Sequence, residues 1–309
     1  MLIWLVHSFH WSFFHSGPVR TALLVGSSAA VVSAVIGVFT ILRGHAFAGH
    51  ALGDVSSAGG SASFFLGISP LAGFLGIAAI AAISLEFLGV RKVREQDVAT
   101  GIVLGAGLGL SALFLYFDIT TTSTSGAAVM VMFGSMFALP SNLIWPAIIV
   151  AALGLGTVAV LYRPLLLSVT DPELAATRGI SNRWVGTLHL LTLAGAVALA
   201  ALSVGSVLAS ALLIGPAAAA LRVSRRPGVA ILWAVILGLG AVWGGIWLAY
   251  ESYYWFSGNA WPVSFFVVAI IFATYLLSVP CQHVLRRRVV VAGVSKPNVE
   301  REAVCSPVS

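Results

Sequence analysis

The sequence predicts an all-α membrane protein, a polytopic helical bundle of about eight to nine transmembrane helices. Hydrophobic residues make up 59% of the 309-residue chain and charged residues only 8%, whereas a soluble domain averages about 25% charged residues. The mean hydropathy is +1.03. The apolar runs are about 20 residues long, as spanning helices require, and do not alternate in segments of about 10 residues as barrel strands do.

Nine apolar segments follow one another along the chain, and each is a candidate membrane helix. They run over residues 20–42, 46–67, 70–90, 98–117, 143–162, 184–202, 204–221, 229–250 and 262–284. Residues 126–139 are apolar but too short to cross comfortably, so we expect a re-entrant or interfacial helix there. The transmembrane domain therefore covers 20–285, between an N-terminal interfacial segment, 1–19, and a polar tail, 286–309, that we expect to be disordered.

Loop charge sets the orientation of these segments. Loops on one face collect most of the basic residues, while Arg20 alone falls on the other. Because cytoplasmic loops carry an excess of Lys and Arg, the first face is cytoplasmic, and so is the C-terminus. The basic residues of this face are Arg43, Arg91, Lys92, Arg94, Arg163, Arg178, Arg183, Arg222, Arg225, Arg226 and Arg286 to Arg288.

Small residues are dense in three segments, 44–63, 101–111 and 203–220. Glycine, alanine and serine allow helix backbones to approach closely in membranes. We therefore expect these three segments to form the packed interior of the bundle.

The stretch GHALGDVSS, residues 49–57, places His50 and Asp54 in an apolar region. Residues at i and i+4 share one face of a helix, and ionisable groups at membrane depth usually face the bundle interior or a wet cavity. An imidazole with a carboxylate suits a divalent ion such as Zn²⁺, Mn²⁺ or Fe²⁺. The pair is also consistent with a structural His–Asp hydrogen bond between packed helices.

The remaining histidines give weaker indications. His45 fits an interfacial histidine, and His189, alone in an apolar span, fits a core histidine with satisfied hydrogen bonds. His7, His10 and His15 crowd the N-terminus, where an aromatic interfacial helix accounts for them better than a metal-collecting patch does.

The stretch YRPLLLSVTDPELAATRGI, 162–180, is the longest polar stretch between spans on the cytoplasmic face. Asp171 is placed to cap a helix, with Pro172 at its first position and Glu173 in its first turn, and Gly179 is placed to stop it. The pattern predicts a short helix outside the membrane, either a linker or a docking element for a cytoplasmic partner.

Several function classes are excluded by the sequence. Neither Lys92 nor Lys296 stands in a GxxxxGK[ST] phosphate-binding loop, so the chain has no nucleotide-binding motif of its own, and HExxH is absent as well. Cys281 and Cys305 give no basis for a disulfide framework or thiolate metal cage. The basic residues lie in short loop clusters, so we expect no nucleic-acid partner. We therefore do not expect an enzyme.

Four stretches of the sequence resemble the permease subunits of ABC importers for zinc, manganese and iron. LRGHAFAGHALGDV (42–55) is similar to the family's LRRMALIGDALSHA, and VREQDVATGI (93–102) to its R-E-D/T-A-x-G-I turn. The family has an LFGS segment followed by YRPLLL and DPELARxxGI. The matching stretches here are MFGSMFAL (132–139) and the 162–180 stretch. VGSVLASALLIGPAAAA (204–220) matches VGxLLVxALLxxPAATA. The resemblance covers about Arg20 to Leu285.

This resemblance implies a fold like the cobalamin-importer permease and a place in the bacterial plasma membrane. Two permease copies form the pathway, each on an ATPase subunit that hydrolyses ATP, and an extracytoplasmic binding protein delivers the ion. The chain itself keeps no permanently bound cofactor. The 171–179 helix corresponds to the coupling helix pressed into the ATPase, with Asp171, Pro172, Glu173, Leu174, Arg178 and Gly179 as its matching residues.

The order of the two metal-binding residues departs from the family pattern. The family's GDALSH places Asp first and His four residues later, whereas here His50 precedes Asp54. The ligand pair and its spacing survive the exchange. Two rival functions remain at this point: a permease of the same fold for a metal chelate or vitamin, and a membrane enzyme using the His50/Asp54 pair.

Overall fold

The computed structural model describes residues 16–87, 93–122, 126–224, 226–255 and 261–294. Nine long helices account for most of these residues. They are α3 (Gly17–Leu42), α4 (Ala46–Leu66), α5 (Pro70–Phe87), α6 (Val93–Phe117), α8 (Ile144–Thr170), α10 (Asn182–Val204), α11 (Ser206–Val223), α12 (Pro227–Trp255) and α13 (Val263–Val294).

Short elements connect these helices at both ends of the bundle. A π-helical turn (Asp118–Thr122), the seven-residue helix α7 (Ala127–Phe133) and two 3₁₀ turns (Met136–Ala138 and Ser141–Leu143) lie between α6 and α8. Helix α9 (Pro172–Thr177) joins α8 to α10. The region 126–139, for which the sequence predicted a helix too short to cross the membrane, is thus a short helix followed by a turn.

Eight helices in the described part of the chain are long and apolar enough to cross a membrane. These correspond to eight of the nine apolar segments, and the protein is a multi-pass helical membrane protein as the sequence predicted. The ninth long helix, α4, falls outside this group because serine, glycine, His50 and Asp54 dilute its apolar residues. A helix so polar must cover its polar groups with protein or with a wet path.

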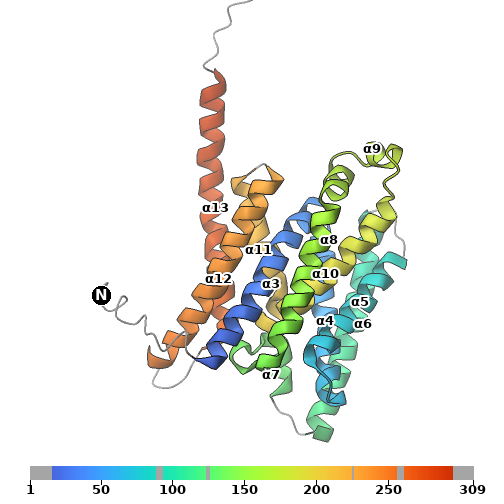
Figure 1. The fold of residues 1–309 in the computed structure, drawn as a ribbon, viewed down its shortest axis with the longest axis vertical. Coiled ribbons are helices and arrows are strands. Elements are labelled where there is room, and N and C mark those ends of the chain that lie inside the picture. The colour runs from blue at the N-terminus through green and yellow to red at the C-terminus, as the bar shows by residue number, and fades with distance from the viewer. Residues whose placement is uncertain (1–15, 88–92, 123–125, 225, 256–260, 295–309) are drawn as a thin grey trace, which may run out of the picture.

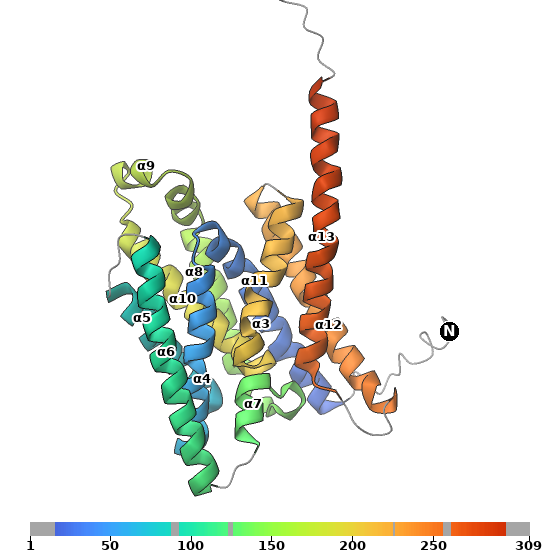
Figure 2. The same cartoon turned by 180° about the vertical axis from the view of Figure 1, so that it is seen from behind.

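Helix α3 lies in the middle of the bundle, and the other helices surround it (Figures 1 and 2). Helices α4 to α6 lie on one side of it and α11 to α13 on the other, while α8 and α10 also pack against it. Val25, Ala29, Ile36 and Phe39 of α3 are fully buried. The core of the chain is therefore built on α3 and α10, and α6, α8 and α13 lie at its periphery.

The same end of the bundle holds α9 and the C-terminal end of α13, and α7 lies at the opposite end (Figure 1). Helix α13 continues to Val294, into the predicted tail, and residues 295–309 lie outside the described residues. Helix α3 begins at Gly17, so residues 1–15, including His7, His10 and His15, also lie outside them.

The prediction that 101–111 packs in the interior is wrong for a single copy of the chain. Glycines 101, 105 and 109 of α6 have open space where a Cβ would lie, and Ile102 and Leu108 are exposed. Gly107 and Ser111, by contrast, pack against α4. The small residues of α6 thus lie on two sides of the helix, and the described part of the chain covers only one of these sides.

Candidate metal site on helix α4

Four polar residues of helix α4 lie on one side of the helix. The helix begins after a turn in which Gly44 has φ +73° and ends at Gly67, whose φ is +66°. His50, Asp54, Ser57 and Ser61 recur at intervals of four, three and four residues, which places them in one stripe along the helix.

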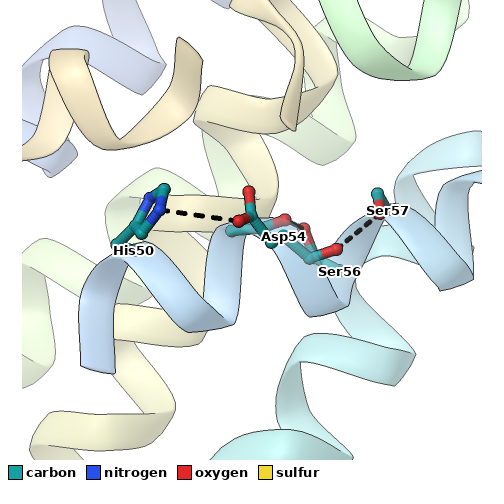
Figure 3. A network of polar contacts seen from close by, with 5 residues as sticks. His50, Asp54, Ser56 and Ser57 are labelled. Atoms are coloured by element: carbon teal, nitrogen blue, oxygen red, sulfur yellow. Dashed lines mark hydrogen bonds and ion pairs between the residues drawn. The ribbon is translucent and has the colours of Figure 1, made fainter. Parts of the chain in front are cut away.

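His50 and Asp54 meet within this stripe, as their spacing predicted (Figure 3). His50 Nε2 lies 3.6 Å from Asp54 Oδ2. Two ligand atoms that share a tetrahedral ion at about 2.1 Å stand about 3.4 Å apart, so the gap matches the bite of a shared ion. The His50 side chain is 43% exposed and that of Asp54 15%. The pair is therefore open to further ligands on the His50 side.

Glycines form the other side of α4 and hold the stripe in its orientation. Without side chains they allow α5, α10 and α11 to approach closely. The side chains that fill these positions are Leu213 against Gly49, Val197 against Gly53 and Phe74 against Gly60.

Two serines tie the candidate site to α6. Ser57 Oγ donates a hydrogen bond to the backbone carbonyl of Asp54, and its hydroxyl is 3.0 Å from that of Ser111 on α6. Both serines are buried, and Gly107 lies directly against Val55. The position of Asp54 thus depends on contact between α4 and α6. Sequence reasoning missed this connection, although Ser57 follows Asp54 at the helical spacing of three.

We predict that Ser57→Ala destabilises the folded protein by about 0.5–2 kcal/mol, because it leaves the buried Ser111 hydroxyl without its partner. Thermal unfolding in detergent measures the effect. Ser63→Ala is the matched control, since the buried Ser63 hydroxyl bonds only within α4. Equal melting temperatures for the two variants would show that the Ser57–Ser111 contact contributes nothing.

The described residues contain no group of three or more His, Cys, Asp or Glu side chains able to hold a metal ion. His50 and Asp54 can thus supply two ligands to a metal ion, and any further ligands would come from outside the described residues. A two-residue site of this kind suits an ion in passage better than one held permanently, because a structural ion takes about four protein ligands.

His45 and His189 lie together elsewhere in the bundle. Their ring centroids are 6.0 Å apart. His45 precedes α4 in the turn after α3, and burial, followed by the nearby Arg43 guanidinium, lowers its pKa to about 4. His189 of α10 is fully buried, and neither ring nitrogen has a hydrogen-bond partner among the described residues. The predicted satisfied core histidine is therefore buried but not satisfied.

The short helix α9 has the predicted capping residues. The Leu174 N–H donates to Asp171 Oδ1 at 2.9 Å, the helix starts at Pro172 with Glu173 in its first turn, and Gly179 follows it with φ +75°. A positive φ favours glycine, which has no Cβ to clash. Glu173, Leu174 and Arg178 are exposed. The helix therefore presents a rigid outer surface away from the bundle.

Comparisons with known proteins match the chain over nearly its whole length. The model of the ABC 3 transport family matches residues 17–281. The manganese transport system membrane protein MntC of Listeria innocua is 29% identical over 269 residues, which is 87% of this chain and 93% of that protein. The high-affinity zinc uptake system membrane protein ZnuB of Haemophilus influenzae is 28% identical over 232 residues, 74% of this chain and 86% of that one.

A solved structure shares the fold. PsaBC from Streptococcus pneumoniae, in complex with Fab, superposes with a TM-score of 0.76 and 23% sequence identity. The match covers 93% of this chain and 100% of that chain. The fold predicted from the sequence is thereby confirmed.

Proposed function

The chain belongs to the ABC 3 transport family, and from this membership we propose that it imports Mn²⁺ or Zn²⁺ as the permease of an ATP-driven complex. It is a transporter subunit and not an enzyme, as the sequence predicted. Relatives named for manganese and for zinc transport fit the ligand chemistry of an imidazole with a carboxylate.

The observation that carries the proposal is the His50–Asp54 pair on the one long helix too polar to stand among the eight apolar spans of the described chain. Two copies of the permease would bring two such pairs together and complete a shell of four protein ligands. The uncovered glycine face of α6, with Gly101, Gly105 and Gly109, supports a second copy of the chain as a neighbour.

The end of the bundle that holds α9 faces the cytoplasm in this proposal. Arg43 follows α3, Arg178 follows α9 and Arg226 precedes α12, and the ends of these helices lie at this end of the bundle (Figure 1). This agrees with the excess of positive charge expected inside. The C-terminus is then cytoplasmic, in the bacterial plasma membrane. The opposite end, with α7, would receive the ion from an extracytoplasmic metal-binding protein.

Helix α9 would couple ATP hydrolysis to transport. Residues Asp171 to Gly179 form a capped, protruding element, and the ATPase subunit would hold it in a groove. Movement of the ATPase on closing around ATP would then shift α9 and the two helices it joins, α8 and α10. Such rigid-body motion could expose the His50–Asp54 pair alternately to the two sides of the membrane.

We predict that Leu174→Asp lowers uptake to below about a tenth of the wild-type rate, because an unpaired carboxylate would be buried where an apolar side chain docks. Leu174 is 40% exposed on α9. ATP hydrolysis and uptake, measured together in proteoliposomes, give the result. Thr177→Ala, at an exposed position of the same helix, should import normally. Wild-type uptake by Leu174→Asp would exclude α9 from the coupling interface.

The proposed function is tested by reconstituting the permease with its ATPase and binding protein and measuring ATP-dependent uptake of Mn²⁺ and Zn²⁺. We expect at least one of the two ions to accumulate. A complex that accumulates neither ion, or only a metal chelate, would contradict the proposal.

A further inference from the structure

His189 is a buried polar side chain whose role the proposed transport path does not explain. Its exposure is 0%, and both ring nitrogens are without a hydrogen-bond partner in the described structure. Burying a polar group without a partner is costly, so buried polar atoms nearly always have one. The unpartnered ring of His189 therefore indicates that a ligand binds to its imidazole nitrogen at this point of the fold.

The His45 ring faces this position. The two ring centroids are 6.0 Å apart and the ring planes are inclined by 38°. When an imidazole nitrogen binds a metal at about 2.1 Å, the ring centroid lies about 3.2 Å from the ion. Two rings that share one ion therefore have centroids no more than about 6.4 Å apart, and the observed separation falls within this limit. Imidazole ligands suit Zn²⁺, Cu²⁺, Ni²⁺ and Fe²⁺ among the transition-metal ions.

Charged groups flank the two rings. Arg43 is close enough to act electrostatically on both histidines, and its charge opposes that of a bound cation. Glu86 offsets Arg43: a Cβ added at Gly186 would lie 3.7 Å from Glu86 Oε2 and 4.0 Å from Arg43 Nη2. A cation here would be held by two imidazole rings against the charge of Arg43, so the expected affinity is modest.

A cavity of about 310 Å³ lies beside Glu86. It is lined by Ile83, Glu86, Phe87, Trp184 and Thr187. Phe87 is 78% exposed and Trp184 71% exposed, so the cavity lies at the surface, at the end of α5 and the start of α10. This is the end of the bundle that carries α9.

The two histidines are separate from the His50–Asp54 pair. His45 lies in the turn before α4, whereas His50 lies within the helix. His45 lies against His189 of α10, while His50 belongs to the polar stripe that includes Ser57, which contacts Ser111 of α6. An ion between His45 and His189 would therefore not lie on the proposed path.

We propose that His45 and His189 bind a second divalent transition-metal ion, with water completing its coordination, and that this ion inhibits ATP hydrolysis. The inference rests on the proposed function, because it assigns cytoplasmic metal as the inhibitor. The ion joins the α3–α4 turn to α10, and α10 follows directly from α9. A bound ion thus holds α9 in one position and slows the cycle when cytoplasmic metal is abundant.

The test uses the full complex with its ATPase and binding protein in proteoliposomes, with Zn²⁺ added on the nucleotide side. We expect Zn²⁺ to inhibit ATP hydrolysis of the wild type. In His45→Met and in His189→Leu, the Zn²⁺ concentration for half-inhibition should rise by at least about tenfold, the least that loss of even an indirect partner costs. Unchanged inhibition in both variants would overturn the inference.

Binding is measured separately with Co²⁺, whose visible absorption reports imidazole ligands. The complex is first made with His50→Ala and Asp54→Ala, so that the α4 pair no longer contributes. We expect a residual Co²⁺ spectrum that disappears when His189→Leu is added. Absence of any residual Co²⁺ spectrum, which is the result if only water occupies the site, would also overturn the inference. Loss of uptake in the wild type would instead contradict the proposed function, so the two failures are distinguishable.

Discussion

Uptake of Mn²⁺ and Zn²⁺ should be lost in His50→Ala and in Asp54→Ala, because each substitution removes half of the proposed ligand pair. The two groups are 3.6 Å apart on one stripe of α4. Loss of an indirect partner of a metal site already costs about 10–100-fold in affinity, so loss of a direct ligand should lower uptake at subsaturating metal by at least about 100-fold. Radiolabelled uptake into proteoliposomes measures it, with ATP hydrolysis followed in parallel.

The exchange variant His50→Asp/Asp54→His separates ligand loss from misfolding. It keeps one imidazole and one carboxylate at the same spacing, in the order seen in the resembling permeases, and should retain part of the uptake. Ser56→Ala is a matched control, because Ser56 is buried on α4 outside the stripe and its hydroxyl bonds only to the Gly53 carbonyl. Normal uptake by both alanine variants would remove the pair from the transport path.

The helices could be predicted from the sequence because local chemistry decides them. Apolar runs of about 20 residues leave the backbone no alternative to helix in a bilayer. The start and end of α9 follow from Asp171 and Gly179, whose capping roles are local as well. The contact between His50 and Asp54 could be predicted from their spacing for the same reason, because both belong to one helix.

Contacts between helices were not predictable in this way. The Ser57–Ser111 and His45–His189 contacts join residues from different helices, and a helical period gives no information about which helix faces which. The glycine content of residues 101–111 led to the wrong prediction of an interior segment for the same reason. Small residues allow close approach, but nothing in the described part of the chain packs against α6 on its Gly101 side.

The crossing of α4 and α5 gives the second large prediction. Gly59 and Gly73 meet there backbone to backbone: a Cβ at Gly59 would lie 2.0 Å from the Gly73 carbonyl oxygen, and a Cβ at Gly73 would lie 2.2 Å from that of Gly59. Neither position can admit a methyl group unless the helices separate. We therefore expect Gly59→Ala and Gly73→Ala each to destabilise the protein by about 3 kcal/mol, the upper end of the usual cost of overpacking.

Separating α4 from α5 also moves the helix that carries His50 and Asp54, so uptake should fall with stability in the Gly59 variant. Gly76→Ala is the matched control, since it lies one turn along α5 from Gly73 with nothing within 4 Å of the added Cβ, and alanine is the better helix former. Thermal unfolding and uptake of the three variants decide the matter. If Gly59→Ala melts and imports like Gly76→Ala, the close α4–α5 crossing does not set the position of the metal-binding pair.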